Sequence, residues 1–185
     1  MTVIWKWIGF LVVSIGIIWL SSASIRDPKS HGFYRFFSWE IILVLFLRNV
    51  DGWFFNPWGV RQLFSWSFLI FSLVFIIAGV ITFKKHGKID KHREDNLLVG
   101  IEKTSQLVTI GIYQYIRHPF YSSLLFLGWG IFLKNINWLG LFLVLVNTVI
   151  LFVTARIEEK ENLNFFGKSY QVYMQETKMF VPFIF

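Results

Sequence analysis

Long apolar stretches with almost no charge are the feature that most limits how this chain can fold. The first, Val3–Leu20, is interrupted only by Lys6, and residues 63–83 carry no charge at all. Two further apolar runs, 119–133 and 138–153, lie close together later in the chain. A helix needs about 20 mostly apolar residues to cross a bilayer. Only 16% of the residues are charged, against about a quarter in soluble domains. The sequence therefore predicts an all-α integral membrane protein.

One more segment, residues 41–47, is apolar but short, because Glu40 precedes it and Arg48 and Asp51 follow it. This segment either crosses the membrane or enters and returns on one side. We predict that it crosses, which gives about five transmembrane helices plus a C-terminal amphipathic helix. Residues 21–24, which read S-S-A-S, are also compatible with signal-peptidase cleavage after the first run.

The chain is predicted to form a single domain over residues 1–185, since no linker rich in Pro, Gly or Ser divides it. Residues 1–100 would form a three-span N-terminal part. Residues 101–185 would carry the polar motif that begins at Gln106, a helical hairpin and the C-terminal helix.

The positive charges are distributed unevenly between the loops. With five spans, only Lys6, Arg48, Arg61 and Lys134 fall on one side, and the other fourteen lysines and arginines fall on the opposite side. Loops rich in Lys and Arg stay in the cytoplasm, so the C-terminus and the candidate site are predicted to be cytoplasmic. The same charges attract anionic headgroups, so the expected partner is the lipid bilayer rather than nucleic acid.

The chain contains no cysteine, which excludes thiolate metal sites and cysteine nucleophiles. The sequence also has no zinc-ligand spacing, no Ser-His-Asp order and no P-loop. No metal is therefore predicted.

The polar residues that suggest chemistry lie in the C-terminal half. From Gln106 the sequence reads Q-L-V-T-I-G-I-Y-Q-Y-I-R-H-P-F-Y-S-S. Pro119 suits the first position of a helix, and the residue before a proline is pushed out of helical geometry, so His118 is expected at the helix cap. Arg117, His118 and the free N–H groups of the first turn could then bind a carboxylate or a phosphate. The alternative for Arg117 is a basic anchor among the headgroups.

An acidic cluster follows the last apolar run, where the sequence reads T-A-R-I-E-E-K-E. Successive helix positions point about 100° apart, so Glu158 and Glu159 are not expected to face one ligand together. The hairpin returns this cluster to the membrane face that carries Arg117 and His118, a combination that suits a zwitterionic ligand. The alternative is a solvated helix end.

An aromatic stripe comes next, formed by Leu163, Phe166, Tyr170 and Tyr173 at helical spacing. It predicts one helix with an aromatic face, which either lies on the membrane or covers a pocket. Gly167 within this stripe is attributed to close packing.

Together, these motifs resemble one known family. The patterns L-V-T-x-G-x-Y-x-Y-x-R-H-P-x-Y and E-E-x-x-x-L-x-x-F-G-x-x-Y-x-x-Y, followed by P-F-I, are similar to the isoprenylcysteine carboxyl methyltransferases, which are related to the membrane phospholipid N-methyltransferases. The resemblance covers residues 101–184.

The resemblance implies a methyltransferase that uses S-adenosylmethionine as its cofactor. It implies His118 and Glu158 as the residues closest to the chemistry. The cofactor would be contacted by Gln106, Leu107, Val108, Tyr113, Arg117, His118, Pro119, Phe120, Tyr121, Glu158 and Glu159.

The acceptor of the methyl group is expected to be lipophilic or embedded in the membrane, with a carboxylate or an amine as the nucleophile. Members of the family carry an arginine before the paired glutamates, where Thr154 stands here and Arg156 follows two residues later. Arg156 is therefore one candidate substrate residue. Glu40 is the other, because an acidic residue at the boundary of a span is often functional, although it could instead pair with Arg35 at headgroup level.

Two other functions remain open from the sequence. Sterol-reductase-type enzymes bind NADPH with a similar R-H-P-x-Y segment, although they generally carry Asn where this chain has Phe120. A membrane scaffold without catalytic activity could also keep the same fold.

Overall fold

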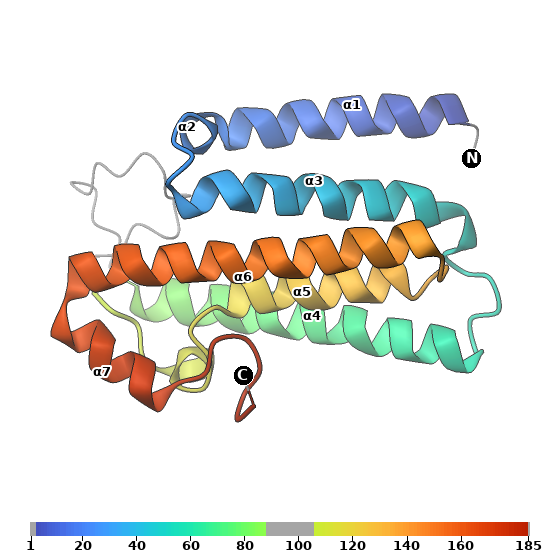
Figure 1. The fold of residues 1–185 in the computed structure, drawn as a ribbon. Helices are drawn as coiled ribbons and strands as arrows, with labels where there is room; N and C mark the ends of the chain where they lie inside the picture. The colour runs from blue at the N-terminus through green and yellow to red at the C-terminus, as the bar shows by residue number, and fades with distance from the viewer. Residues whose placement is uncertain (1–2, 88–105, 185) are drawn as a thin grey trace.

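The computed structural model describes residues 3–87 and 106–184, and helices form most of this part of the chain (Figure 1). Their bounds are α1 Val3–Leu20, α2 Ser22–Ile25, α3 His31–Asn49, η1 Val50–Gly52, α4 Val60–His86, η2 Gly111–Gln114, α5 Pro119–Phe132, α6 Trp138–Phe166 and α7 Lys168–Glu176. The five long helices run side by side, with α3 packed on α6 and α4 on α5. The described residues pair as a β-bridge at one place, between Ile116 and Lys178.

Three of the described helices, α1, α4 and α6, are long and apolar enough to cross a membrane. This finding confirms the predicted class, an all-helical integral membrane protein. The shorter α5 is apolar but has only 14 residues. The more polar α3 is one continuous helix of 19 residues, about 28 Å long, and does not turn back along its length. That α3 crosses the membrane stays a prediction.

Small polar side chains join neighbouring helices inside the bundle. Ser38 on α3 donates to Asn147 Oδ1 on α6 at 2.7 Å, and Ser65 on α4 donates to the Gly130 carbonyl of α5, also at 2.7 Å. In lipid, where apolar contact alone does not drive helices together, such hydrogen bonds and close backbone approaches hold a bundle together. They fix how α3, α4, α5 and α6 lie against one another, and therefore where their ends meet.

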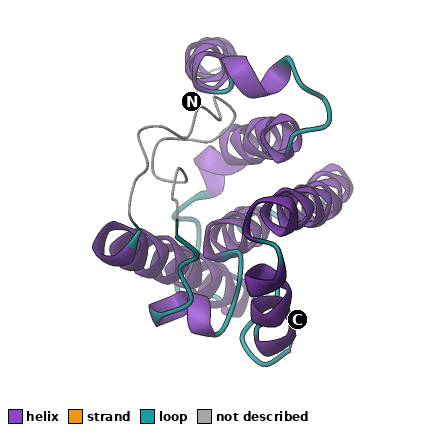
Figure 2. Cartoon of the chain, turned by 90° about the vertical axis from the view of Figure 1, so that its left-hand side faces the viewer, coloured by secondary structure: helices purple, strands orange, loops and turns teal. Residues whose placement is uncertain are grey.

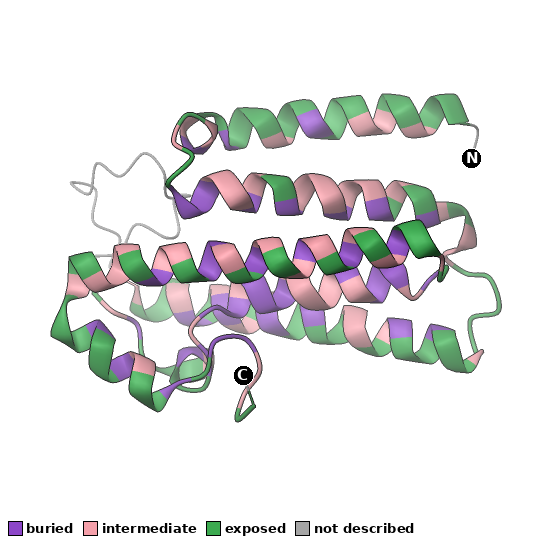
Figure 3. Cartoon of the chain, viewed as in Figure 1, coloured by how far each residue is buried: buried purple, intermediate pink, exposed green. Residues whose placement is uncertain are grey.

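Helix α1 lies at the edge of the bundle, at the top of Figures 1 and 2, and is mostly exposed along its length (Figure 3). Ser14 is the one buried side chain that the structure describes on α1, and its hydroxyl donates to Glu40 Oε2 on α3 at 2.7 Å. An ion pair of 2.6 Å between Lys6 and Asp51 ties the N-terminal end of α1 to η1. Glu40 therefore holds α1 against α3.

The chain turns sharply at Gly167, between α6 and α7, and the prediction of one helix through the aromatic stripe is wrong. Gly167 has φ 59° and ψ −131°, a conformation that residues with a Cβ rarely adopt. A Cβ added there would meet nothing within 4 Å, so close packing is not the reason for this glycine. The turn lets α7 fold back toward the bundle with Tyr170 and Tyr173 buried.

We expect Gly167→Ala to destabilise the protein by about 1–3 kcal/mol, the usual cost of a side chain in a strained backbone conformation. Gly16→Ala in α1 is the matched control, because its Cβ would also meet nothing within 4 Å but its backbone is helical. Thermal unfolding in detergent should show a lower Tm for the first variant only. Equal Tm values for the two variants would contradict this explanation.

A buried lysine holds the opposite end of the bundle, in the turn between α5 and α6. Lys134 is 1% exposed, and its Nζ donates to Gln62 Oε1 at 3.0 Å. The ammonium lies 3.3 Å from the centre of the Trp66 ring and 5.1 Å from that of Trp53. Burial lowers the pKa of Lys134 to about 8, while the indole faces favour the charged form.

This lowered pKa makes stability depend on pH in a defined range. Between about pH 8 and pH 10.5 the unfolded chain binds more protons at Lys134 than the folded chain does, so stability rises with pH there. The slope approaches about 1.4 kcal/mol per pH unit. Wild-type Tm, measured against pH in detergent, should show this rise, and Lys134→Met should lack that component. Parallel curves for the two proteins would show that Lys134 does not titrate in this way.

Helix α5 is much shorter than the helices beside it. With 14 residues it spans about 21 Å, whereas the 29 residues of α6 span about 43 Å. The α6 helix therefore continues well beyond the start of α5, at the end of the bundle where α7 also lies (Figure 1). This difference in length leaves room for a site.

Candidate active site

A cavity of about 540 Å³ occupies this end of the bundle, within the range of about 300–1,000 Å³ that is typical of small-molecule sites. Its wall is built from the ends of α4 and α6, the start of α5, the face of α7 and the loops that join them. It is therefore large enough for a cofactor-sized molecule.

The start of α5 is fixed by the segment that follows α7. Pro119 is the first residue of α5 and His118 its N-cap, as predicted. The Arg117 N–H donates to the Lys178 carbonyl at 2.9 Å, and the His118 N–H donates to the Met179 carbonyl at 3.2 Å. Met179 is itself buried, so the residues after α7 hold the start of α5 in place from inside the protein.

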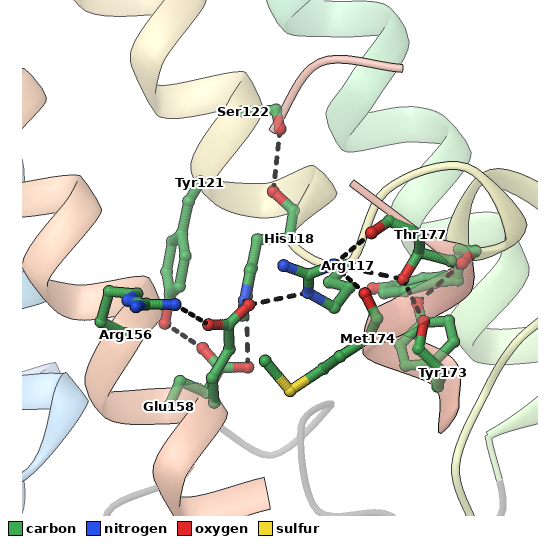
Figure 4. Close-up of polar contacts among 11 residues, drawn as sticks. Arg117, His118, Tyr121, Ser122, Arg156, Glu158, Tyr173, Met174 and Thr177 are labelled. Atoms are coloured by element: carbon green, nitrogen blue, oxygen red, sulfur yellow. Dashed lines mark hydrogen bonds and ion pairs between the residues drawn. The ribbon is translucent and has the colours of Figure 1, made fainter. Parts of the chain in front are cut away.

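The Arg117 side chain is bound by the protein itself (Figure 4). Its Nε donates to Glu159 Oε1 at 2.7 Å, and its Nη1 donates to the carbonyl of Met174 at 3.2 Å and to that of Thr177. These carbonyls lie at the C-terminal end of α7, where a cation is favourable. Arg117 was predicted to bind a ligand anion. Such an anion would have to share the guanidinium with Glu159 and with these carbonyls.

His118 lies between the two glutamates of α6. Its Nδ1 is 3.8 Å from Glu158 Oε1, and its Nε2 is 3.6 Å from Glu159 Oε1, both too long for hydrogen bonds. The ring stacks on that of Tyr121 at 5.4 Å between centroids, and the Tyr121 hydroxyl donates to Glu158. Figure 4 shows His118 and Tyr121 extending from the start of α5 toward Glu158. An imidazole, a phenol and a carboxylate therefore meet at one place.

Glu159 is not part of the cavity wall that the structure describes and lies buried next to His118. It is 2% exposed, and besides Arg117 it accepts a hydrogen bond from Arg156 at 3.3 Å. Glu158, whose side chain is 27% exposed, faces the cavity instead. The two glutamates thus have different surroundings, as their spacing on a helix predicts.

The residues that were predicted to contact the cofactor come together on the cavity wall with one exception, Glu159. Those on the wall are Gln106, Leu107, Val108, Tyr113, Arg117, His118, Pro119, Phe120, Tyr121 and Glu158. The two candidate substrate residues are not among the side chains described on this wall. Glu40 bonds to Ser14, and Arg156 binds Glu159 and lies over the Phe152 ring.

Two tyrosines of α7 close one side of the cavity. The Tyr173 hydroxyl donates to the Tyr113 carbonyl at 2.7 Å and so joins α7 to η2. Burial raises the pKa of Tyr170 and of Tyr173 above the usual range, so both phenols stay protonated donors. This supports the covering role, one of the two alternatives for the aromatic stripe.

Sequence reasoning missed the part of the wall that comes from the loop before α3 and from the last turns of α6. These residues are Asp27, Lys29, Ser30, His31, Glu161, Asn162, Asn164 and Phe165. In sequence, the N-terminal half resembles the isoprenylcysteine carboxyl methyltransferases only in its hydropathy. No local pattern indicated that this loop reaches a site more than 70 residues away in sequence, at Gln106 and beyond.

The fold and the cavity define a class of protein: an all-helical membrane protein with a small-molecule site at one end of its bundle. The family model for phospholipid methyltransferases matches residues 60–171, more than half of the sequence. The chain therefore belongs to the phospholipid methyltransferase family.

Individual relatives agree with this assignment. The chain is 28% identical over 171 residues to methanethiol S-methyltransferase 1 of Bradyrhizobium diazoefficiens, a match that covers 85% of this chain and 56% of that protein. It is 34% identical over 130 residues to protein-S-isoprenylcysteine O-methyltransferase B of Arabidopsis thaliana, covering 68% of this chain and 64% of that protein. The chain thus spans less than two thirds of the length of these relatives. No solved structure matches it.

We expect Arg117→Met to destabilise the protein by about 3–5 kcal/mol, because it leaves the Glu159 carboxylate buried without its nearest partner. The double variant Arg117→Met/Glu159→Gln should recover part of this loss, since no buried charge remains at that position. Chemical unfolding in mixed micelles measures both. A double variant no more stable than Arg117→Met would show that the pair is not the reason for the loss.

Proposed function

We propose that this protein transfers the methyl group of S-adenosylmethionine to a lipophilic acceptor at the membrane surface. The observation that carries the proposal is the cavity itself. Its wall gathers the His118, Tyr121 and Glu158 group and several aromatic faces, and much of it comes from the segment that matches the family.

The side chains on the wall fit this cofactor. Glu158 offers a carboxylate to an amino group, and the rings of Tyr113, Phe120, Tyr121 and Tyr170 offer faces that attract a sulfonium by cation–π interaction. His118 Nε2 is buried and has no hydrogen-bond partner among the residues that the structure describes. When bound, S-adenosylmethionine supplies an electrophilic methyl group whose sulfur leaves as a neutral thioether.

The protein's own contribution would be position and, where needed, proton removal. Holding two reactants at the right distance and angle can itself supply several kcal/mol. A carboxylate acceptor needs no base, whereas a thiol or an amine must lose a proton. His118 and Glu158 are the groups placed to accept it, with Tyr121 fixing the Glu158 carboxylate.

The acceptor class is supported by the position of the cavity and by the relatives. The cavity lies at the end of a membrane bundle, where an amphiphile can reach it from the bilayer surface. The relatives are named for methanethiol and for isoprenylcysteine, both of which have apolar character. Family membership favours methyl transfer over the NADPH-dependent reductase alternative.

We also propose that the cavity end faces the cytoplasm. Lys84 and Lys85 end α4 at this end of the bundle, and Lys168 begins α7 there. Lys88, Lys91, Arg93 and Lys103, which contribute to the predicted asymmetry, lie outside the described residues. Since the chain has no cysteine, single substitutions at Lys178 and at Trp58 can be labelled from each side of sealed vesicles. Labelling of the Lys178→Cys protein from the outside would contradict this orientation.

Calorimetric titration of the detergent-purified protein with S-adenosylhomocysteine tests the cofactor. We expect binding in the micromolar range. His118→Gln and Glu158→Gln should each weaken it by about tenfold or more, equivalent to about 1.4 kcal/mol. Glu176→Gln is the matched control, because Glu176 is exposed at the end of α7.

NADPH is titrated alongside on the same protein. Folded wild-type protein that does not bind S-adenosylhomocysteine would overturn the proposal. Binding of NADPH in its place would indicate a reductase.

A further inference from the structure

One wall of the cavity comes from outside the segment that matches the family model. The match begins at residue 60, but the loop between α2 and α3 contributes Asp27, Lys29 and Ser30 to the lining, and the first residue of α3 contributes His31. This loop lies at the end of the bundle where α6 passes into α7 (Figure 1). The cavity thus has one side that the family model covers and one side that it does not.

The loop is held in a defined shape by its own hydrogen bonds. The Lys29 N–H donates to Asp27 Oδ1 at 3.0 Å, and the Ser30 hydroxyl donates to the Asp27 carbonyl at 2.8 Å. Ser30 also caps α3 by accepting from the Phe33 N–H at 3.3 Å. A loop fixed in this way can present the same surface to every ligand.

His31 fastens this loop to α6 at two points. Its main-chain N–H donates to Glu161 Oε1 at 3.1 Å, and its Nδ1 lies 2.5 Å from Glu161 Oε2, a hydrogen bond that the carboxylate accepts. His31 is 1% exposed and stands at the first position of α3, where the helix dipole also favours a carboxylate. We call these two hydrogen bonds between His31 and Glu161 the His31–Glu161 clasp. Glu161 itself lines the cavity, so the clasp is part of the cavity wall.

The two carboxylates that α6 presents to the cavity have different partners. Glu158 is bound by Tyr121 beside His118, and Glu161 is bound by His31. They are three residues apart and therefore lie on the same face of the helix. Both carboxylates lie within the family-matched segment, but Glu161 is bound by His31, which lies outside it.

We propose that the His31–Glu161 clasp is a positioning device for the methyl acceptor and helps to decide which acceptor is used. This inference rests on the proposed function. The relatives share one kind of reaction but are named for different acceptors, methanethiol and isoprenylcysteine. The loop that ends at His31 lies outside the family-matched segment and lines the cavity, so it is placed to contact the acceptor, which differs between the relatives. The methyl donor, S-adenosylmethionine, then contacts the side of the cavity that carries Glu158.

The test uses the purified protein and measures separately how a variant affects binding of the methyl donor and use of the methyl acceptor. His31→Leu removes the side-chain bond to Glu161, whereas His31→Asn keeps a donor close to the position of Nδ1. S-adenosylhomocysteine affinity is measured by titration. The values of kcat and KM are measured with methanethiol, an S-prenylated cysteine and a phosphatidylethanolamine vesicle as acceptors.

For His31→Leu we expect S-adenosylhomocysteine affinity within about twofold of wild type. The acceptor KM should rise at least about tenfold, or the ratio of kcat/KM between two acceptors should change by as much. The Asn variant should restore most of the difference, and Glu176→Gln should behave as wild type.

Three results would overturn the inference. A loss of donor binding in parallel with every acceptor rate would make His31 a structural residue only. Unchanged kinetics in His31→Leu would show that the clasp does not position the acceptor. Wild-type protein that fails to bind S-adenosylhomocysteine would instead remove the proposed function, on which the inference rests.

Discussion

The ion pair between Arg117 and the buried carboxylate of Glu159 is the interaction on which the rest of the site depends. Arg117 joins three separate parts of the chain: its own segment before α5, Glu159 on α6 and the carbonyls that end α7. Glu159 is 2% exposed, and a buried charge of this kind is stable only when it is paired and hydrogen-bonded. Its partners therefore have little freedom to move, and the neighbouring His118 is held in the same arrangement.

The cavity exists because the helices of the bundle end at different depths. Helix α5 stops short, and α6 continues past it carrying both Glu158 and Glu161. The space beyond the start of α5 is then closed by η2, by α7 and by the loop before α3. Polar contacts such as Ser38 with Asn147 and Ser65 with the Gly130 carbonyl keep the helices from sliding, so the offset between their ends is maintained. The site is thus a product of bundle geometry as much as of the residues that line it.

The features that could be predicted from the sequence are those that depend on neighbours in sequence. Apolar runs gave the helices, and Pro119 fixed the start of α5 with His118 outside it. The spacing of Glu158 and Glu159 on one helix correctly implied that they face different surroundings. Residues 106–121 and Glu158 carried a recognisable pattern, and those of them that were predicted to contact the cofactor do meet on one cavity wall.

The features that were missed depend on contacts between distant segments. His31 reaches Glu161 across 130 residues, and nothing near His31 in sequence signals that contact. Glu40 and Lys134 are charged residues whose partners, Ser14 and Gln62, come from other helices. Gly167 was assigned to packing because a glycine inside an apparently helical pattern does not reveal a positive φ. In each case the deciding contact or dihedral angle exists only in the folded bundle.

The pairing of residues 115–118 with residues 178 and 179 has a consequence for the order in which the protein assembles. The hairpin of α5 and α6 can enter the membrane while the ribosome is still synthesising α7. At that stage the carbonyls of Lys178 and Met179, which receive the Arg117 and His118 N–H groups, do not yet exist. The helices can therefore be inserted co-translationally, whereas the start of α5 on the cavity wall is fixed only after residue 179 has left the ribosome. Insertion and completion of the site are separate events in the life of this chain.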